Sequence, residues 1–420
     1  YALLEEDLGC RWYGRETATI PNRRDLTFRP VPRTFVPTLQ IRDPFYWYAR
    51  HSDWSLRNRT NAYNAKVAEA WGGHVNYPPG WFVHTFDRLV SPKEHFEDHP
   101  EYFALVDGER IHHVPGHRPG QLCLTNDDVV EIAIERVRHV LGKHPDVDLI
   151  SVSENDGRAG QCECENCGAI NDREGTPAGT LVRFMNAIGE AIASEHPAWM
   201  PTTLASGPTF TPPKTIRPRE NVMIRVCTDM HAWPHPYLKV TETQEFQSAL
   251  KGWASLGARI SIWDYTANFG AYMRPHPNMS VVADNMRFYI EHNARGIMLQ
   301  GAYQSPGADR APMRSWVWAK QLWDASLQTL PLMRDFIYGY YGNAAPAMWD
   351  YNELLWRVWE NWHASGDGPE GERPEYPVRK ETITEGLALF ERAEDLAEDE
   401  RTLQRVKLAK LAPMYERLQW

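Results

Sequence analysis

The sequence predicts a (β/α)8 TIM barrel, an α/β fold, with the remnant of an N-terminal α/β domain before it and a C-terminal helical extension after it. Strand-like apolar runs alternate with amphipathic segments over roughly the 250 residues that such a barrel needs. No glycine-rich phosphate loop follows any of these runs, which favours the barrel over an open doubly wound sheet. The eight predicted strands are Thr38–Arg42, Trp81–Phe86, Gln121–Thr125, Leu149–Ser153, Pro201–Ser206, Val222–Cys227, Arg259–Asp264 and Gly296–Gln300.

Amphipathic stripes between the runs predict the helices of the barrel. Apolar residues recur at helical spacing, so each segment offers one apolar face to the sheet. The first helix is expected after Thr125-Asn126-Asp127, whose side chains are typical of helix N-caps. The stripes are Val130, Ile134, Val137 and Leu141; Leu181, Phe184, Met185, Ile188 and Ile192; and Val282, Met286, Tyr289 and Ile290.

Composition shifts divide the chain into three parts. We predict that residues 1–34 are the tail of a preceding small domain and its Pro-rich linker, residues 35–327 the barrel, and residues 328–420 the helical extension. A loop rich in Gly, Glu and Pro, from Gly366 to Pro377, splits the extension. The chain starts at Tyr1 without an initiator Met, so we expect it to begin inside a longer protein.

Charge and composition exclude some classes of protein. The net charge of −10 disfavours an electrostatic grip on nucleic acid or anionic lipid. No apolar run approaches membrane-spanning length. The aromatic fraction of 12%, with 17 Trp and 18 Tyr, suits either stacking on sugar rings or packing of a large core. Composition alone slightly favours packing of a large core over stacking on sugar rings.

The segment Ser151–Gly157 carries the strongest functional signal. A short buried strand ends abruptly in Glu154, Asn155 and Asp156 before a glycine. Acids at the carboxyl end of a strand lie where α/β folds place their chemistry, so we predict catalysis by paired carboxylates. Strict alternation, however, points Glu154 toward the outer helices, unless a bulge at the strand end redirects it. The alternative is that Glu154 caps a loop or pairs with an arginine outside the barrel.

Other strand ends supply candidate substrate contacts. Asp264 closes the seventh predicted strand, where it could face a carboxylate of strand four or be a structural Asp bonded to loop amides. The flanking Trp263 and Tyr265 could form a sugar platform or pack the barrel rim. His84 is either a substrate contact at the mouth of the barrel or a core histidine. Asn126, Asp229 and His231 are further candidates, each of which could only cap a helix or a turn, and Gln300 and Tyr303 are expected to contact sugars.

Three cysteines follow the acidic segment in a C-x-C-x-x-C pattern. Cys162, Cys164 and Cys167 could join Cys123 at the end of strand three in a tetrahedral Zn²⁺ site. The same thiols could instead form disulfides or stay as buried thiols. We expect a structural clip without metal, and no cofactor.

Several motifs in a fixed order resemble a bacterial family long catalogued as a domain of unknown function and later recognised as glycoside hydrolase family 163. The resemblance covers nearly the whole chain. It rests on Leu4–Trp12, His99–Phe103, Gln121–Asn126, Glu154–Gly157 with the three cysteines, Ile262–Tyr265 and Tyr340–Gly342.

This resemblance implies a barrel hydrolase that acts as an endo-β-N-acetylglucosaminidase on N-glycans, with a glycan or glycoprotein as its partner. It also implies an extracellular, periplasmic or cell-surface enzyme. In acetamide-assisted catalysis by retaining enzymes, one group protonates the leaving oxygen and a second orients the acetamide of the substrate. We assign protonation of the leaving oxygen to Glu154 and orientation of the acetamide to Asp156, with Asn155 assisting.

Two rival functions stay open. Relatives are expected to carry an acid about where this chain has Leu299, which keeps a catalytically lapsed carbohydrate-binding barrel in view. An exo-acting hydrolase of acidic sugars, of the α-glucuronidase kind, would need basic groups such as Arg42, Arg225 or Arg274. A Ser/His/Asp hydrolase is disfavoured because no G-x-S-x-G elbow occurs.

Overall fold

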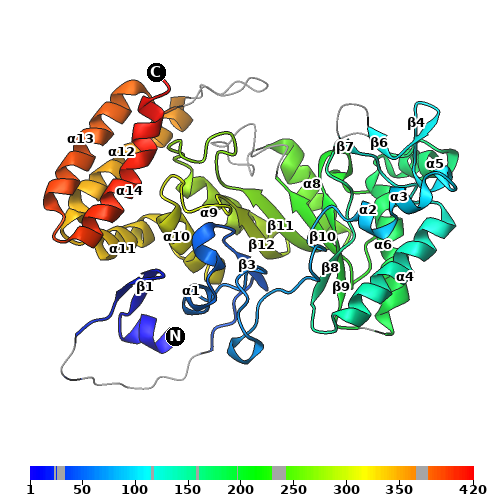
Figure 1. The fold of residues 1–420 in the computed structure, drawn as a ribbon, viewed down its shortest axis with the longest axis horizontal. Coiled ribbons are helices and arrows are strands. Elements are labelled where there is room, and N and C mark those ends of the chain that lie inside the picture. Colours follow the sequence, from blue (N-terminus) through cyan, green and yellow to red (C-terminus); the bar gives the residue numbers. More distant parts are fainter. Residues whose placement is uncertain are drawn as a thin grey trace.

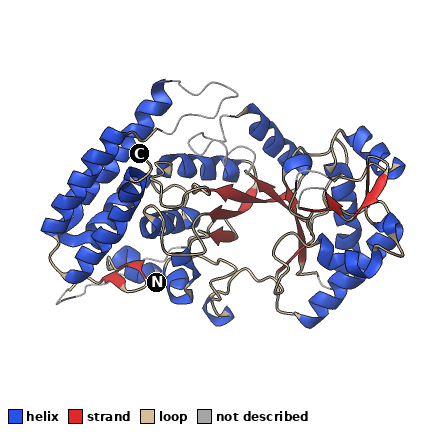
Figure 2. Ribbon diagram, turned by 45° about the horizontal axis from the view of Figure 1, so that its top comes forward, coloured by secondary structure: helices blue, strands red, loops and turns tan. Residues whose placement is uncertain are grey.

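A parallel β-sheet of six strands forms the centre of the protein in a computed structural model, with helices packed around it (Figures 1 and 2). The structure describes residues 1–22, 25, 34–114, 118–157, 160–195, 197–228, 243–365 and 377–420. The sheet curls into a half-barrel. In spatial order its strands are β3 (Ile41–Asp43), β12 (Ala294–Gln300), β11 (Arg259–Tyr265), β10 (Met223–Cys227), β9 (Met200–Ala205) and β8 (Leu149–Ser151).

The two faces of the sheet bury different side chains, as the alternation along each strand requires. Ile262 and Leu299 point outward into the main core under the helices. Trp263 and Met298 point inward and pack with rings inside the half-barrel. The helices on the outer face are α4 (Asp127–Lys143), α6 (Ala178–Ala193), α8 (Gln244–Ser255), α9 (Met279–Glu291) and α10 (Ala311–Trp323). The helices predicted from these stripes, α4, α6 and α9, are thus confirmed. On α4 the buried face lies partly one residue earlier than predicted, because Val129 and Ala133 are buried while Val130 and Ile134 are only partly buried against the core.

Two of the eight predicted strands are wrong. Trp81–Phe86 is irregular and leads into the short helix α2 (Phe86–Leu89), and Gln121–Thr125 forms only an isolated bridge from Leu122 to Phe103. His84 explains the first error, because its φ of 54° is left-handed and cannot continue a strand. The full barrel predicted from the sequence is therefore corrected to a half-barrel of six strands.

Irregular segments cover the gap between β3 and β8. The Asn61 N–H donates to the Arg42 carbonyl at 3.2 Å, and the Leu149 N–H donates to the Asn76 carbonyl at 3.1 Å. The Thr85 N–H donates to the Ser153 carbonyl at 3.0 Å. Loop backbone thus satisfies edge groups that strands two and three of a closed barrel would have paired.

The N-terminal residues pack against the helices that follow the sheet. Strands β1 (Arg11–Gly14) and β2 (Thr17–Thr19) form an antiparallel hairpin. The Tyr13 ring lies 5.2 Å from that of Trp316 in α10, and its hydroxyl donates to Asp335 at 2.5 Å. The division at residue 34 stays a prediction, and the predicted linker lies outside the described residues.

The C-terminal part is helical, as predicted, and its helices stand at one end of the molecule (Figure 1). They are α11 (Thr329–Tyr341), α12 (Ala345–Ser365), α13 (Lys380–Leu396) and α14 (Glu400–Arg417). In the described part of the chain, no helix is long and apolar enough to cross a membrane. The remaining named elements are α1 (Ser52–Arg57), α3 (Pro92–His95), β4 (Ala104–Val106), β5 (Glu109–Ile111), β6 (His113–Val114), β7 (Arg118–Pro119) and α5 (Glu165–Glu174), with short π or 3-10 helices at Leu3–Asp7, Trp47–Arg50, Glu69–Trp71, Pro100–Tyr102, Gly207–Thr209 and Gly342–Ala344.

Gly339 lets the N-terminal hairpin approach α11 closely. A Cβ at this position would lie 2.2 Å from the Tyr13 ring, whereas a Cβ at Gly142 in α4 would meet no atom within 4 Å. We expect Gly339→Ala to lower the free energy of unfolding by about 1–3 kcal/mol through overpacking. Gly142→Ala should raise it by up to about 1 kcal/mol, because alanine favours a helix. Urea denaturation of both variants measures the two effects, and an equal response would contradict the close packing.

Candidate active site at the carboxyl end of β8

Glu154 is a buried carboxyl group just beyond the end of β8, with 8% of the residue exposed. Its Oε1 accepts a hydrogen bond from Gln161 Nε2 at 2.8 Å, and its Oε2 lies 2.8 Å from the hydroxyl of Thr209, which follows β9. The imidazole Nδ1 of His84 lies 2.8 Å from the Glu154 carbonyl oxygen. The nearby Gln161 and two segments distant in the sequence, those of His84 and Thr209, therefore fix this residue.

The surroundings of Glu154 favour its neutral form. Burial raises its pKa, while the hydrogen bonds from Gln161 and Thr209 lower it only in part. Thr209 has one hydroxyl proton but two acceptors in reach, Glu154 Oε2 and the Ser206 carbonyl oxygen at 3.0 Å. A protonated Glu154 can donate to Thr209, whose own proton then goes to Ser206. The hydrogen-bond partners of Glu154 can therefore accommodate a protonated carboxyl group.

Asn155 is bonded to the scaffold on every side. Its backbone N–H donates to Gln121 Oε1 at 3.0 Å, and its carbonyl accepts from Gln121 Nε2 at 3.1 Å. Its side-chain amide donates to Asp87 at 2.8 Å and to the Gly120 carbonyl at 2.7 Å. The amide of Asn155 therefore positions the segment, and its two donors are taken.

Asp156 and His84 lie at the surface beside this buried pair. Asp156 is exposed and takes part in interactions of its own. His84 is also exposed, and its backbone N–H donates to the Ser153 hydroxyl at 2.9 Å. A left-handed histidine costs energy, and such strain is concentrated at functional positions. Both residues are exposed at the end of the strand.

A group of aromatic and amide side chains lies on the inner face and at the carboxyl ends of β11 and β12. Trp263 and Tyr265 stack with ring centroids 6.1 Å apart. The indole N–H of Trp263 donates to Gln300 Oε1, and Tyr303 stacks on Phe45 at 4.6 Å. Tyr265, Gln300 and Tyr303 are only partly buried. The structure therefore brings these four predicted residues into one neighbourhood.

Asp264 points the other way, toward the helices. Its carboxylate accepts hydrogen bonds from Thr228 at 2.8 Å and from Tyr289 of α9 at 3.1 Å. Burial raises its pKa to about 6. Leu299, its register partner on β12, is likewise buried in the outer core. The structure thus gives Asp264 the structural surroundings that the sequence left as the alternative, and it places Leu299 away from the inner face.

Among the remaining predicted residues, only Asn126 lies in the described part of the chain. Asn126 caps α4, its side chain accepting from the Val129 N–H at 3.1 Å. Asp229 and His231 lie outside the described residues.

Sequence reasoning missed Asp43, which faces the interior of the half-barrel from β3. Burial raises its pKa to about 7, although the charge of Arg225 and a hydrogen bond from the Tyr63 backbone lower it. Within the described residues its Oδ1 has no hydrogen-bond partner. The Arg225 guanidinium lies 5.0 Å from the Phe82 ring centroid and donates to the Tyr77 hydroxyl. Only the tertiary packing reveals this pair, because Asp43 ends a three-residue strand without a motif.

Two of the three basic residues named for an acidic sugar, Arg42 and Arg274, are engaged outside the interior of the half-barrel. Arg225 lies inside the half-barrel among aromatic rings. Arg274 pairs with Glu416 of α14 at 2.8 Å, and Arg42 donates to the Arg59 carbonyl at 2.9 Å. Of the three arginines, Arg225 is thus the one that the structure places in the interior, beside Trp263.

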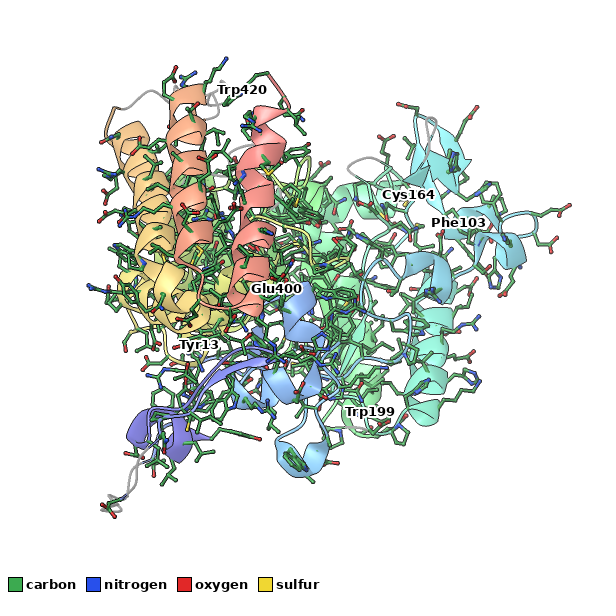
Figure 3. All side chains as sticks on the ribbon, turned by 60° about the vertical axis from the view of Figure 1, so that its left-hand side comes forward. Tyr13, Phe103, Cys164, Trp199, Glu400 and Trp420 are labelled. Atoms are coloured by element: carbon green, nitrogen blue, oxygen red, sulfur yellow. The ribbon has the colours of Figure 1, made fainter. Side chains whose placement is uncertain are left out.

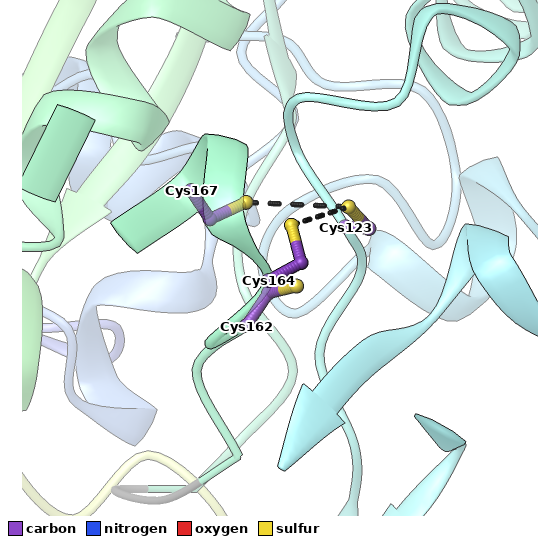
Figure 4. A group of neighbouring side chains, drawn as sticks. All are labelled: Cys123, Cys162, Cys164 and Cys167. Carbon is purple, nitrogen blue, oxygen red and sulfur yellow. Dashed lines mark hydrogen bonds between the residues drawn. The ribbon is translucent and has the colours of Figure 1, made fainter. Parts of the chain in front are cut away.

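The four cysteines named from the sequence meet at one point (Figure 4). Their sulfur atoms all lie within 4.8 Å of one another, and all four are free thiols. Cys162 directly follows Gln161, the residue that binds Glu154. The cluster is thus adjacent in the chain to a residue of the candidate site.

Residues 12–353 match the family described as "Domain of unknown function (DUF4838)", and the chain belongs to this family. The match includes Glu154, the aromatic group and all four clustered cysteines. A comparison with functionally curated proteins gives no match.

Two solved structures show remote similarity. One is described as "Structure of CpGH84B", with 10% identity, a TM-score of 0.38, and coverage of 68% of this chain and 50% of that chain. The other concerns the GH20 catalytic modules of the pneumococcal exo-beta-D-N-acetylglucosaminidase StrH, with 14% identity, a TM-score of 0.27, and coverage of 70% and 64%. The chain spans less than two thirds of either structure. Such low TM-scores carry no argument about function, which rests on the site itself.

Asp43 makes folding stability depend on pH. Its pKa is about 7 in the fold and 3.8 in the unfolded reference, so the fold binds the proton more tightly. The resulting stabilisation is complete below about pH 4 and is lost as the pH rises through about 7, with an upper limit of about 4 kcal/mol. Urea unfolding at pH 5 and pH 8 should show that wild type loses more stability with rising pH than Asp43→Asn, which cannot ionise. Equal losses would contradict a buried, proton-binding Asp43.

Proposed function

We propose that this protein is a retaining glycoside hydrolase that cleaves β-linked N-acetylhexosamine, acting within N-glycans and using the acetamide of the substrate. The observation that carries the proposal is Glu154, a buried carboxyl group with a raised pKa at the carboxyl end of a central strand. Leaving-group protonation favours a carboxyl group whose pKa lies above its ordinary value. The order of motifs shared with glycoside hydrolase family 163 supports the same reaction.

Each neighbouring group has a part in the proposed reaction. Glu154 protonates the glycosidic oxygen, and Gln161 and Thr209 hold its carboxyl group. Asp156, exposed two residues further on, accepts the acetamide N–H as the acetamide oxygen attacks the anomeric carbon. Asn155 keeps both acids in place through Gln121 and Asp87. Water then opens the cyclic intermediate, with Glu154 acting as base.

Aromatic side chains supply a surface for sugar rings. Trp263, Tyr265 and Tyr303 lie near the carboxyl ends of β11 and β12, with Gln300 among them. Rings of this kind stack on the apolar faces of pyranoses, and the amide can bond hydroxyl groups. A glycan substrate fits an enzyme outside the cytoplasm, which we propose as its location. A lapsed enzyme that only binds glycans is the second candidate, and turnover separates the two.

Glu154→Gln should abolish release of N-glycans from a glycoprotein that carries complex and high-mannose chains. We expect glycans that leave with a single reducing-end N-acetylglucosamine, detected by mass, and a rate at least about 10²-fold lower in the variant. Glu163→Gln is the matched control, because Glu163 is exposed in the same loop and its side chain accepts a hydrogen bond from the backbone N–H of Asp107, away from Glu154. Retained binding without turnover in wild type would favour the lapsed enzyme.

Leaving-group chemistry separates a proton donor from a merely structural Glu154. A highly activated aryl glycoside needs little protonation, so Glu154→Gln should lose far less activity on it than on the natural linkage. An equal loss on both substrates would instead indicate a damaged fold.

Progressive fluorination of the substrate's N-acetyl group tests the second part of the mechanism. Fluorine weakens the acetamide oxygen as a nucleophile, so the wild-type rate should fall steeply with each fluorine added. Asp156→Asn should lower the rate with the normal acetamide by about 10²-fold or more, since it removes the charge that stabilises the developing positive charge. A rate independent of fluorination would show that an enzyme carboxylate, not the acetamide, is the nucleophile.

A further inference from the structure

The cysteine cluster joins two distant segments of the chain. Cys123 follows Leu122, which bridges to Phe103, and Cys164 and Cys167 lie at the N-terminus of α5 (Figure 4). Cys162, two residues before Cys164, completes the set. Cys164 lies at the end of the molecule away from α14, which begins at Glu400 and ends shortly before Trp420 (Figure 3). It therefore belongs to the half of the protein that holds Glu154.

The sulfur positions suit one tetrahedral ion. Zinc binds thiolate sulfur at about 2.3 Å, which places neighbouring sulfurs about 3.8 Å apart in a tetrahedron. The Cys123 sulfur lies 3.6 Å from that of Cys164 and 4.0 Å from that of Cys167. None of these contacts is at the disulfide length of about 2.05 Å. An iron–sulfur cluster would need its thiolates spread around a larger body than this space holds.

The surroundings supply what a thiolate site needs. The Leu105 N–H donates to the Cys162 sulfur at 3.4 Å, and the Thr125 hydroxyl lies 3.1 Å from the Cys167 sulfur. The Arg110 guanidinium reaches the Cys162 sulfur at 3.8 Å. Four thiolates and Zn²⁺ carry a net charge of −2, which this cation and the N-terminus of α5 offset. Three of the four cysteines are buried, so water competes little for the ion.

We propose that Cys123, Cys162, Cys164 and Cys167 bind one Zn²⁺ ion in a closed structural site. Four protein ligands leave no open position, so the ion takes no part in catalysis. The geometry favours this metal clip over the metal-free clip expected from the sequence. Binding converts four thiols to thiolates and releases their protons to solvent.

The proposed site explains how the catalytic segment is held. Gln161, which binds the Glu154 carboxyl group, is covalently next to Cys162. Gln121, which bonds both backbone groups of Asn155, lies two residues before Cys123. One ion would thus hold in place both Gln161 and Gln121, which bond Glu154 and Asn155. The metal site itself stands whatever reaction the protein catalyses.

Metal analysis of the full chain, purified without an affinity tag or chelator, tests the proposal. Mass spectrometry of the metals should find one zinc per chain in wild type and almost none in Cys123→Ser and Cys167→Ser. Cys10→Ser is the matched control, because Cys10 is also buried but lies outside the cluster, and it should keep its zinc. Replacement of zinc by cobalt should give the thiolate-to-metal charge transfer and visible bands of tetrahedral Co²⁺.

A titration of wild type covers the case in which the serine variants fail to fold. A mercurial reagent should release one zinc, read with a colorimetric chelator, as four thiols react. Zinc-free wild type with a disulfide between any two of the four cysteines, found by peptide mapping without reductant, would overturn the proposal. Iron in place of zinc would do the same, as would zinc that stays in the folded serine variants.

Discussion

The open edge of β8 is the constraint on which the rest of this structure depends. A six-stranded parallel sheet that does not close leaves backbone groups at its edges, and buried groups of this kind must be paired. Loop segments pair them here, with Thr85 bonding Ser153 and Asn76 bonding Leu149. The same bonds hold the chain beyond β8. The contacts that satisfy the open edge of the sheet therefore also position the candidate site.

Burial and hydrogen bonding divide the carboxyl groups of the sheet by role. Glu154 lies at the strand end with its proton favoured, whereas Asp264 is bonded to Thr228 and Tyr289 under the helices. Asp43 faces inward beside Arg225. All three side chains are buried, so burial raises the pKa of each. Glu154 lies beside the exposed His84 and Asp156, which supports the catalytic role that we propose for it.

Six of the eight strands were predictable because their apolar residues are continuous and lie between helical stripes. The two wrongly predicted strands have local causes that hydrophobic periodicity does not reveal. At His84 the backbone turns left-handed, and at Leu122 the chain only bridges to Phe103. The cap at Asn126 was named correctly as an alternative, since Asn before an apolar stripe is a common N-cap. Asp43 had no signal, because three residues form its whole strand.

The sequence by itself determined the parallel α/β architecture, the helical C-terminal part and the acidic strand end, because hydrophobic periodicity and residue type are local properties. The tertiary structure alone decided that the sheet stays open and that Asn155 is tied to Gln121 and Asp87. It also decided that Asp264 faces helices and that four cysteines from two segments meet. These outcomes depend on contacts between residues far apart in the chain, which no local pattern encodes.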